Sequence, residues 1–130
     1  MKRTKLRKKS KQKISVLQRK LWEECKRIIR RDYGNTCFTC GAYPLSGANW
    51  HTGHLWPKAS LGAYLKYDLR VLRPQCYHCN INLGGNGAVY YKKMLDEFGA
   101  EYMSQLEMSK QVSVKAYEHY EKLLTDYSQL

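Results

Sequence analysis

Two short cysteine motifs constrain this chain more than any other feature. Cys37 and Cys40 form one C-x2-C pair, Cys76 and Cys79 form a second, and 35 residues separate Cys40 from Cys76. A tetrahedral Zn²⁺ takes four thiolates at about 2.3 Å, and each C-x2-C turn brings two thiolates to one point. We therefore predict a closed, structural zinc site. The alternative, a redox motif, expects one C-x2-C beside a βαβ pattern, which this sequence lacks.

The length and the cysteine count both favour a small domain stapled by metal. The chain has 130 residues and five cysteines, an odd number that argues against a disulfide framework. The fifth, Cys25, falls in an apolar helical stripe, and we predict a small core residue. The opening MKRTKLRKKSKQK is too charged for a secretory signal, and no apolar run approaches the ~20 residues of a membrane span. We therefore expect a soluble, intracellular, cytoplasmic protein.

Positive charge is concentrated at the N-terminus. The chain carries 23 Lys and Arg against 11 Asp and Glu, and residues 1–31 alone account for the net charge of +12. A block this basic usually binds a polyanion, because each neutralised phosphate releases counterions. We predict that residues 1–14 form a disordered arm that binds nucleic acid, and the alternative is a solvated arm that aids solubility. The candidate DNA contacts in the arm are Lys2, Arg3, Lys5, Arg7, Lys8 and Lys9.

Residues 15–130 are predicted to form one domain in three parts. Apolar residues at helical spacing indicate a first helix, with Ser15 and Gln18 as a capping box and Gly34 as its end. The middle part is rich in glycine, aromatic residues and cysteines and has no long segment of regularly spaced apolar residues. In the tail, apolar residues recur at helical spacing again. The three parts are a basic helix at 15–34, a zinc-containing core at 36–86 and a helical tail at 87–130.

The two helical parts carry specific expectations. The first helix surrounds its apolar stripe with basic residues, so it can pack on the core and still contact DNA through Arg27, Arg30 and Arg31. In the tail, AVYYKKMLDEFG predicts a helix that ends at Gly99, and a last helix is expected from about Val112. One face of that last helix gathers residues expected in the core or at a dimer interface: Ala116, Tyr120, Leu123, Leu124 and Tyr127.

The segment between and after the cysteine pairs is more specific than either pair. It contains WHTGHL, with His51 and His54, and YDLRVLRPQCYHCNINLGGN, with an asparagine directly after the last cysteine. Together with the basic helix LWEECKRIIRRDYGNTCFTCG and the tyrosine-rich tail, this pattern resembles the phage NinG (Rap) recombination-protein family and the His-Asn-His (HNH) nucleases. The zinc arrangement is also similar to that of phage endonuclease VII. The implied fold is α+β, with a small HNH-type ββα-metal core flanked by N- and C-terminal helices.

The resemblance implies roles for three polar residues. His54 would be the general base, because a neutral imidazole is available near its ordinary pKa of about 6.5. Asn80, directly after Cys79, would bind a catalytic Mg²⁺ or Mn²⁺ that contacts the scissile phosphate. Many HNH enzymes have an acid immediately before the base. Gly53 stands there in this chain, so the nearest candidate for a second ligand is His51.

Another departure from the family pattern is Val71, which stands where the middle asparagine usually orients the base. We expect a backbone carbonyl or Asp68 to take that role. Within the same segment, Lys58 and Arg73 are predicted to hold phosphate, a contact that positions DNA without reading its sequence.

These expectations combine into a metal-dependent DNA endonuclease. The resemblance implies branched recombination intermediates such as Holliday junctions as substrate and a phage-infected or prophage-carrying cell as setting. Two matched cuts favour a homodimer, with the tyrosine-lined last helix as candidate interface. No small-molecule cofactor is expected. The alternatives are a non-catalytic zinc-ribbon DNA-binding accessory protein, and an HNH nuclease that acts on flap, nicked or linear duplex DNA.

Overall fold

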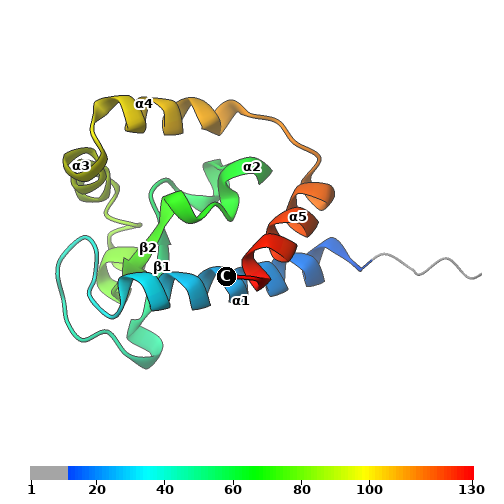
Figure 1. The fold of residues 1–130 in the computed structure, drawn as a ribbon. Coiled ribbons are helices and arrows are strands. Elements are labelled where there is room, and N and C mark those ends of the chain that lie inside the picture. Colours follow the sequence, from blue (N-terminus) through cyan, green and yellow to red (C-terminus); the bar gives the residue numbers. More distant parts are fainter. Residues whose placement is uncertain (1–11) are drawn as a thin grey trace, which may run out of the picture.

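The computed structural model describes residues 12–130, so the predictions for Lys2 to Lys9 lie outside the described residues. Figure 1 shows α1 along one side of the molecule and α4 along the other, with two short strands and α2 between them. The helices and strands are α1 (Ile14–Tyr33), β1 (His51–His54), α2 (Ala63–Lys66), β2 (Leu72–Gln75), α3 (Gly87–Phe98), α4 (Ala100–Met108) and α5 (Ala116–Ser128).

Helix α1 forms because its apolar residues recur on one side, and that side is buried. The buried residues are those of the predicted stripe: Leu17, Leu21, Cys25, Ile28 and Ile29. The prediction that Ser15 caps the helix is wrong, since α1 begins one residue earlier, after Lys13, without a side-chain cap. The predicted end is confirmed. Gly34 takes the left-handed φ of 71° and its N–H bonds to the Arg30 carbonyl at 2.9 Å.

The sheet is a two-stranded antiparallel pair, in which His51 lies opposite Gln75 and His54 opposite Leu72. An isolated pair this short is marginal in water, so other elements must hold it. Tyr90 from α3 does so, because its hydroxyl reaches the Gly53 carbonyl at 3.0 Å and the Val71 carbonyl at 3.2 Å. The second pair of cysteines then follows β2 directly.

The expectation of an α+β fold is confirmed, and the HNH-type core stays a prediction. Directly after β2 comes a single π-helical turn, His78–Asn82, which carries Asn80. The full helix α3 begins only at Gly87, after Gly84 and Gly85 with left-handed φ values of 59° and 99°. The element that presents Asn80 is therefore one turn long.

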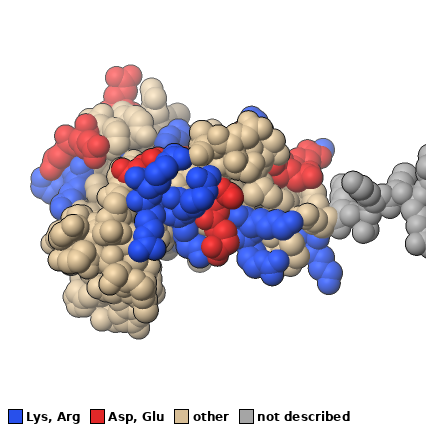
Figure 2. All heavy atoms as spheres, turned by 60° about the horizontal axis from the view of Figure 1, so that its bottom comes forward, with Lys and Arg blue, Asp and Glu red and all other residues tan. Residues whose placement is uncertain are grey.

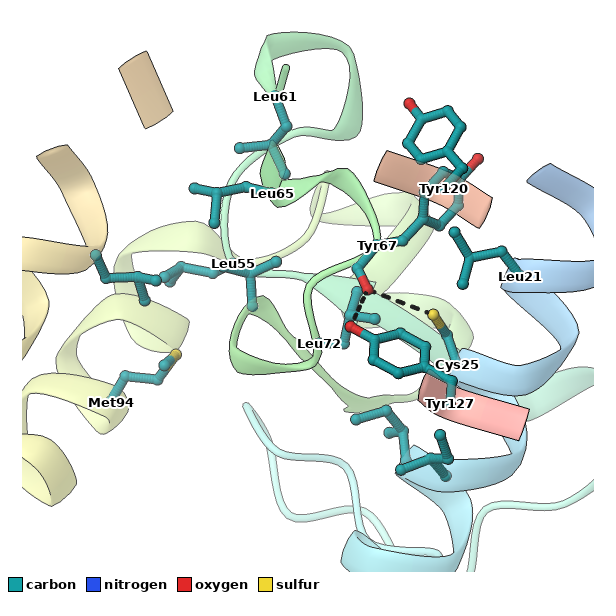
Figure 3. Close-up of a cluster of buried hydrophobic side chains, with 14 of the residues drawn as sticks. Leu21, Cys25, Leu55, Leu61, Leu65, Tyr67, Leu72, Met94, Tyr120 and Tyr127 are labelled. Atoms are coloured by element: carbon teal, nitrogen blue, oxygen red, sulfur yellow. Dashed lines mark hydrogen bonds between the residues drawn. The ribbon is translucent and has the colours of Figure 1, made fainter. Parts of the chain in front are cut away.

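The tyrosine face of the last helix is part of the core of this chain. Helix α5 begins at Ala116, and Tyr120 and Tyr127 are 2% and 8% exposed. Figure 3 shows the hydroxyl of Tyr127 and the thiol of Cys25 both reaching the Tyr67 carbonyl, at 2.9 and 3.6 Å. Of the two roles predicted for this face, core and dimer interface, the two tyrosines have the core role, and the homodimer stays a prediction. The core position predicted for Cys25 is confirmed.

The helical tail also contains α4, a helix that the sequence pattern did not indicate. Only Met103 and Leu106 of this helix are buried. Helix α3, whose end at Gly99 was predicted, likewise buries two residues, Tyr90 and Met94. Within residues 12–130, no helix is both long and apolar enough to cross a membrane.

Candidate functional site

The four cysteines of the two C-x2-C pairs meet in one cluster. The sulfur atoms of Cys37, Cys40, Cys76 and Cys79 all lie within 4.8 Å of one another, and those of Cys40 and Cys76 are 3.7 Å apart. Tetrahedral zinc with bonds of about 2.3 Å to sulfur requires sulfur atoms about 3.8 Å apart. The predicted clustering is confirmed, and the arrangement fits a structural Zn²⁺ with four protein ligands.

Local hydrogen bonds shape both cysteine turns. Gly41 has a φ of 78°, which lets its N–H reach the Cys37 carbonyl at 2.9 Å, and the Cys79 N–H points at the Cys76 sulfur at 3.4 Å. Burial opposes ionisation of the Cys37 thiol, but hydrogen bonds from Thr39 and from backbone amides outweigh it and lower its pKa from 9.0 to about 6. The pKa values of the Cys40 and Cys76 thiols are raised, so Cys37 is the thiol of these three that most readily gives the thiolate that zinc requires.

His54 is held in one orientation at the end of β1. Its ring stacks on Trp22 of α1, with ring centres 5.5 Å apart and 9° between the planes. Its Nε2 lies 2.9 Å from the Lys66 carbonyl oxygen. A carbonyl oxygen only accepts, so Nε2 carries the proton and Nδ1 is the basic nitrogen. The orienting group is thus a backbone carbonyl, one of the two alternatives expected in place of an asparagine at Val71.

The surroundings of His54 favour its neutral form. Burial is the main cause of a lowered pKa, and the charges of Lys58 and Lys66 act in the same direction, against the opposing bond to the Lys66 carbonyl. Asp68, the other candidate for the orienting role, instead pairs with Arg70 at 2.8 Å. The imidazole is therefore unprotonated at neutral pH and able to accept a proton.

His54, Asn80 and Lys58 line one cavity of about 330 Å³. The tertiary structure thus brings together three residues predicted for the site from different parts of the chain. No Asp or Glu is among the lining residues in the described part of the chain, which are Trp22, Thr52, His54, Trp56, Pro57, Lys58, Asn80, Gly84 and Gly85. The cavity is aromatic on one side and positively charged through Lys58.

His51 lies against Asn80 but does not line this cavity. Its Nε2 is 2.9 Å from the Ala48 carbonyl oxygen, and its Nδ1 is 3.1 Å from the side-chain nitrogen of Asn80. Both ring nitrogens therefore have partners, with Nδ1 accepting from the Asn80 amide. This geometry makes His51 a residue that orients Asn80 through its side-chain nitrogen.

Gln75, which the sequence did not suggest as a site residue, explains why Gly53 precedes His54. The Gln75 side chain is fully buried, and its nitrogen donates to Thr39 at 3.1 Å and to the Gly85 carbonyl at 2.8 Å. A Cβ atom at position 53 would overlap the Gln75 side chain. The space that a side chain at position 53 would need is therefore filled by a glutamine that ties the first cysteine turn to the Gly85 loop.

This overlap predicts a stability effect. Gly53→Ala forces Gln75 out of place and should lower the free energy of unfolding by about 3 kcal/mol, through overpacking and lost hydrogen bonds. Urea unfolding measures it. Gly62→Ala is the matched control, because a Cβ there meets nothing within 4 Å. Equal stability of the two variants would contradict the assignment, and Gly53→Ala/Gln75→Ala should recover part of the loss.

Arg73 is in the wrong place for its predicted contact with phosphate. Its side chain is 2% exposed, and its guanidinium lies 4.4 Å from the centre of the Tyr33 ring and 5.6 Å from that of Phe38. It also donates to the Leu72 carbonyl at 2.7 Å. The arginine follows Leu72 in a buried strand, and its charge is stabilised by rings and carbonyls inside the fold.

The other predicted basic residues lie on or near the surface. Lys58 lies 5.3 Å from the Trp22 ring and points its charge at the His54 cavity. Arg27 and Arg31 are exposed and pair with Glu24 and Asp32, at 2.7 and 2.8 Å. Arg30 lies over the ring of Trp50. Figure 2 shows lysine and arginine side chains gathered in a band along α1.

Similarity to known proteins supports a phage family. Protein ninG of Escherichia phage 933W is 31% identical to the chain over 80 residues, and Protein ninG of Escherichia phage lambda and of Salmonella phage P22 are each 30% identical over 80 residues. Each alignment covers 62% of this chain but only 38% of the relative. No solved structure matches the chain.

A family profile gives the wider match. The profile described as Bacteriophage Lambda NinG protein matches residues 1–130, which is the whole chain. The cysteine cluster, the two histidines and Asn80 all lie inside this range. On this match, the chain belongs to the NinG family.

Proposed function

We propose that this protein is a metal-dependent DNA endonuclease that cleaves branched recombination intermediates. The observation that carries the proposal is the position of His54. Its imidazole is neutral, is fixed through Nε2 by the Lys66 carbonyl, and shares a cavity with Asn80 and Lys58. A fixed neutral histidine beside a cation in a cavity is the arrangement that phosphodiester hydrolysis needs in a general base.

In the proposed reaction, His54 accepts a proton from water. The water oxygen attacks phosphorus, the proton of the water passes to Nδ1 of His54, and the bond from phosphorus to the 3′-oxygen breaks. The leaving 3′-oxygen then takes a proton from solvent water and becomes a hydroxyl. The Lys66 carbonyl then stabilises the imidazolium through the Nε2 proton. Lys58 offsets the negative charge of the phosphate from the cavity wall. The Trp22 ring keeps the imidazole in plane for the transfer.

The donor atoms in the cavity fit a divalent ion that shares its coordination shell with the substrate. The Asn80 oxygen is a hard donor of the kind that Mg²⁺ and Mn²⁺ prefer, and His51 holds the other end of that amide. The Thr52 hydroxyl is buried without a partner among the described residues and lines the same cavity. When bound, the ion would supply positive charge to the phosphate and the leaving oxygen. Without a lining carboxylate, phosphate oxygens and water would complete its shell.

The substrate part of the proposal rests on the family and on charge. The relatives are phage proteins, and the chain carries its basic residues along α1 and in the N-terminal arm. The lysines and arginines that we propose as DNA contacts position phosphate without reading base sequence, so we propose recognition of DNA shape. Two cuts across a junction need two active sites. The homodimer that we propose must use a surface other than the buried tyrosine face of α5.

The direct test is cleavage of matched DNA substrates. Purified protein is incubated with a labelled four-way junction, a flap, a nicked duplex and a linear duplex of the same sequence, with no added ion, Mg²⁺ or Mn²⁺. Paired, metal-dependent cuts in the junction are expected. Cleavage of the flap or the linear duplex at the same rate would instead favour a nuclease of broader structure specificity.

The pH dependence of cleavage should report His54. Because burial and nearby lysines lower its pKa, the midpoint at which the rate falls with decreasing pH should lie below the 6.5 of an ordinary histidine. Lys58→Met removes one of the charges that lower the His54 pKa, so the fall in cleavage rate should move to higher pH. Single-turnover rates from pH 4.5 to 8 measure both profiles. An unchanged midpoint in the variant would remove Lys58 from the electrostatics of the site.

One observation favours a second candidate function. The lack of any lining Asp or Glu in the described cavity suits a non-catalytic zinc-binding DNA accessory protein. Such a protein needs the cysteine cluster and the basic band but not His54. Binding to the four-way junction without cleavage in Mg²⁺ and Mn²⁺, at unchanged affinity in His54→Ala, would establish this second function.

A further inference from the structure

A second cavity lies toward the other end of α1. Its volume is about 420 Å³. Tyr33, the last residue of α1, and Phe38, in the first cysteine turn, provide its aromatic walls. Lys93 and Glu97 of α3 provide charged groups at its edge, and the remaining lining residues are Thr36, Cys37, Gly41 and Pro74. None of these residues belongs to the His54 cavity.

Helix α1 relates the two cavities in space. Trp22 stacks on His54, and Tyr33 lies eleven residues further along the same helix. At a rise of 1.5 Å per residue these two side chains are separated by about 16 Å, and eleven residues bring them to nearly the same side of the helix. A single DNA strand that follows α1 can therefore reach both cavities.

The Tyr33 ring is held in place by the buried arginine. Arg73 lies 4.4 Å from the ring centre, and it is itself fixed by the carbonyls of Leu72 at 2.7 Å and Leu69 at 3.3 Å. Tyr33 nevertheless remains 43% exposed. A ring that is already oriented but still accessible loses little conformational entropy when a flat ligand stacks on it.

The charge around this cavity favours a polyanion. Within the described chain, Arg73 has no carboxylate at ion-pair distance, so its positive charge is uncompensated behind the aromatic wall. Arg30 and Arg31 lie in the last turn of α1, which ends at Tyr33, and Lys93 and Glu97 contribute one charge of each sign to the cavity lining. Flat aromatic walls beside positive charge are typical of sites for single-stranded nucleic acid.

We propose that this cavity binds one unpaired nucleobase of the DNA, stacked on Tyr33 and Phe38, while the strand continues along α1 to His54. The separation of about 16 Å along α1 leaves a few nucleotides of strand between this base and the scissile phosphate. The link to cleavage rests on the proposed nuclease function, whereas the binding site itself does not. Such a site would select DNA with unpaired bases near a branch.

The test uses fluorescence of 2-aminopurine, which stacking on an aromatic ring quenches. The base analogue is placed in the single-stranded part of a flapped oligonucleotide, and the full chain is titrated with no divalent ion added, so that no cleavage occurs. Wild type should quench the signal. Tyr33→Ala should lose the quenching and bind about tenfold more weakly, the usual effect of one lost base stack. Phe38→Leu should also reduce both the quenching and the affinity for the oligonucleotide.

Two control variants separate stacking from general damage. Tyr33→Phe keeps the ring and should behave as wild type, and Met108→Ala removes a 72% exposed apolar side chain away from the cavity and should have no effect. Zinc content and melting temperature confirm that each variant is folded. Equal quenching by wild type, Tyr33→Ala and Phe38→Leu would overturn the proposal. Unchanged DNA affinity together with binding of an apolar peptide in this cavity would overturn it as well.

The result can be separated from the outcome for the nuclease. Quenching that depends on Tyr33 in a protein that cleaves no DNA would keep this site and reject the nuclease. Cleavage that proceeds normally, with quenching that does not depend on Tyr33, would reject this site alone. Quenching retained in His54→Ala would show that the base binds at Tyr33 independently of His54, which lies on β1.

Discussion

Cys76→Ser is expected to leave the chain unfolded at room temperature. The sulfur of Cys76 lies 3.7 Å from that of Cys40 in the four-cysteine cluster, so the substitution removes one of four zinc ligands. Structural zinc contributes about 10 kcal/mol or more to folding in small zinc domains, and a domain of this size is stable by only ~5–15 kcal/mol. Zinc content per chain and the thermal unfolding curve measure the effect.

Cys25→Ser is the matched control for this experiment. Cys25 is also buried, but it lies in α1 among core residues, and burial raises the pKa of its thiol to about 12, so it is not a thiolate. This variant should keep one zinc per chain and lose stability only through a buried hydroxyl. If Cys76→Ser kept its zinc and its melting temperature, the four-thiolate assignment would be wrong.

His54→Ala is expected to lower the cleavage rate by about 10²–10⁴-fold, the usual contribution of a general base. Because His54 stacks on Trp22 and bonds to the Lys66 carbonyl, it is not a surface contact for DNA. Junction affinity should therefore stay nearly unchanged. Single-turnover cleavage and binding titrations on the same four-way junction separate the two effects.

His78→Ala provides the control for the loss of a histidine. His78 is exposed, contacts Asn82 at 3.3 Å and does not line the His54 cavity. The His78→Ala variant should cleave the junction at the wild-type rate. A loss of junction binding in His54→Ala, with cleavage per bound complex unchanged, would show that His54 contacts DNA and is not the base. His54→Gln, which restores side-chain volume, guards against a packing defect beside Trp22.

The cysteine motifs and the first helix could be predicted because their signals are local. A C-x2-C turn converges two sulfurs whatever surrounds it, and the buried stripe of α1 follows from helical spacing alone. The end of α3 at Gly99 followed for the same reason, since glycine takes the left-handed φ of 88° found there. By contrast, the cap of α1 was missed because several polar residues precede the stripe and no side chain fixes the start.

Residues that depend on distant partners were harder to predict. Arg73 looks like a phosphate contact in the sequence, yet rings from α1 and from the first cysteine turn enclose it. Gln75 gave no signal at all, because its role depends on Thr39, Gly53 and Gly85 meeting across the sheet. A glycine directly before a proposed base was the only local sign that another side chain fills that space.

The sequence by itself determined which residues are candidates for the chemistry, and the tertiary structure decided how they are arranged. Four cysteines, His54 and Asn80 could be identified from spacing and resemblance, because motif chemistry needs particular atoms at short separations. That the Lys66 carbonyl orients His54, that His51 holds Asn80, and that the tyrosines of α5 cover α1 and Tyr67 could not. Those contacts join segments far apart in the chain, and only the packing of the whole fold determines which of them meet.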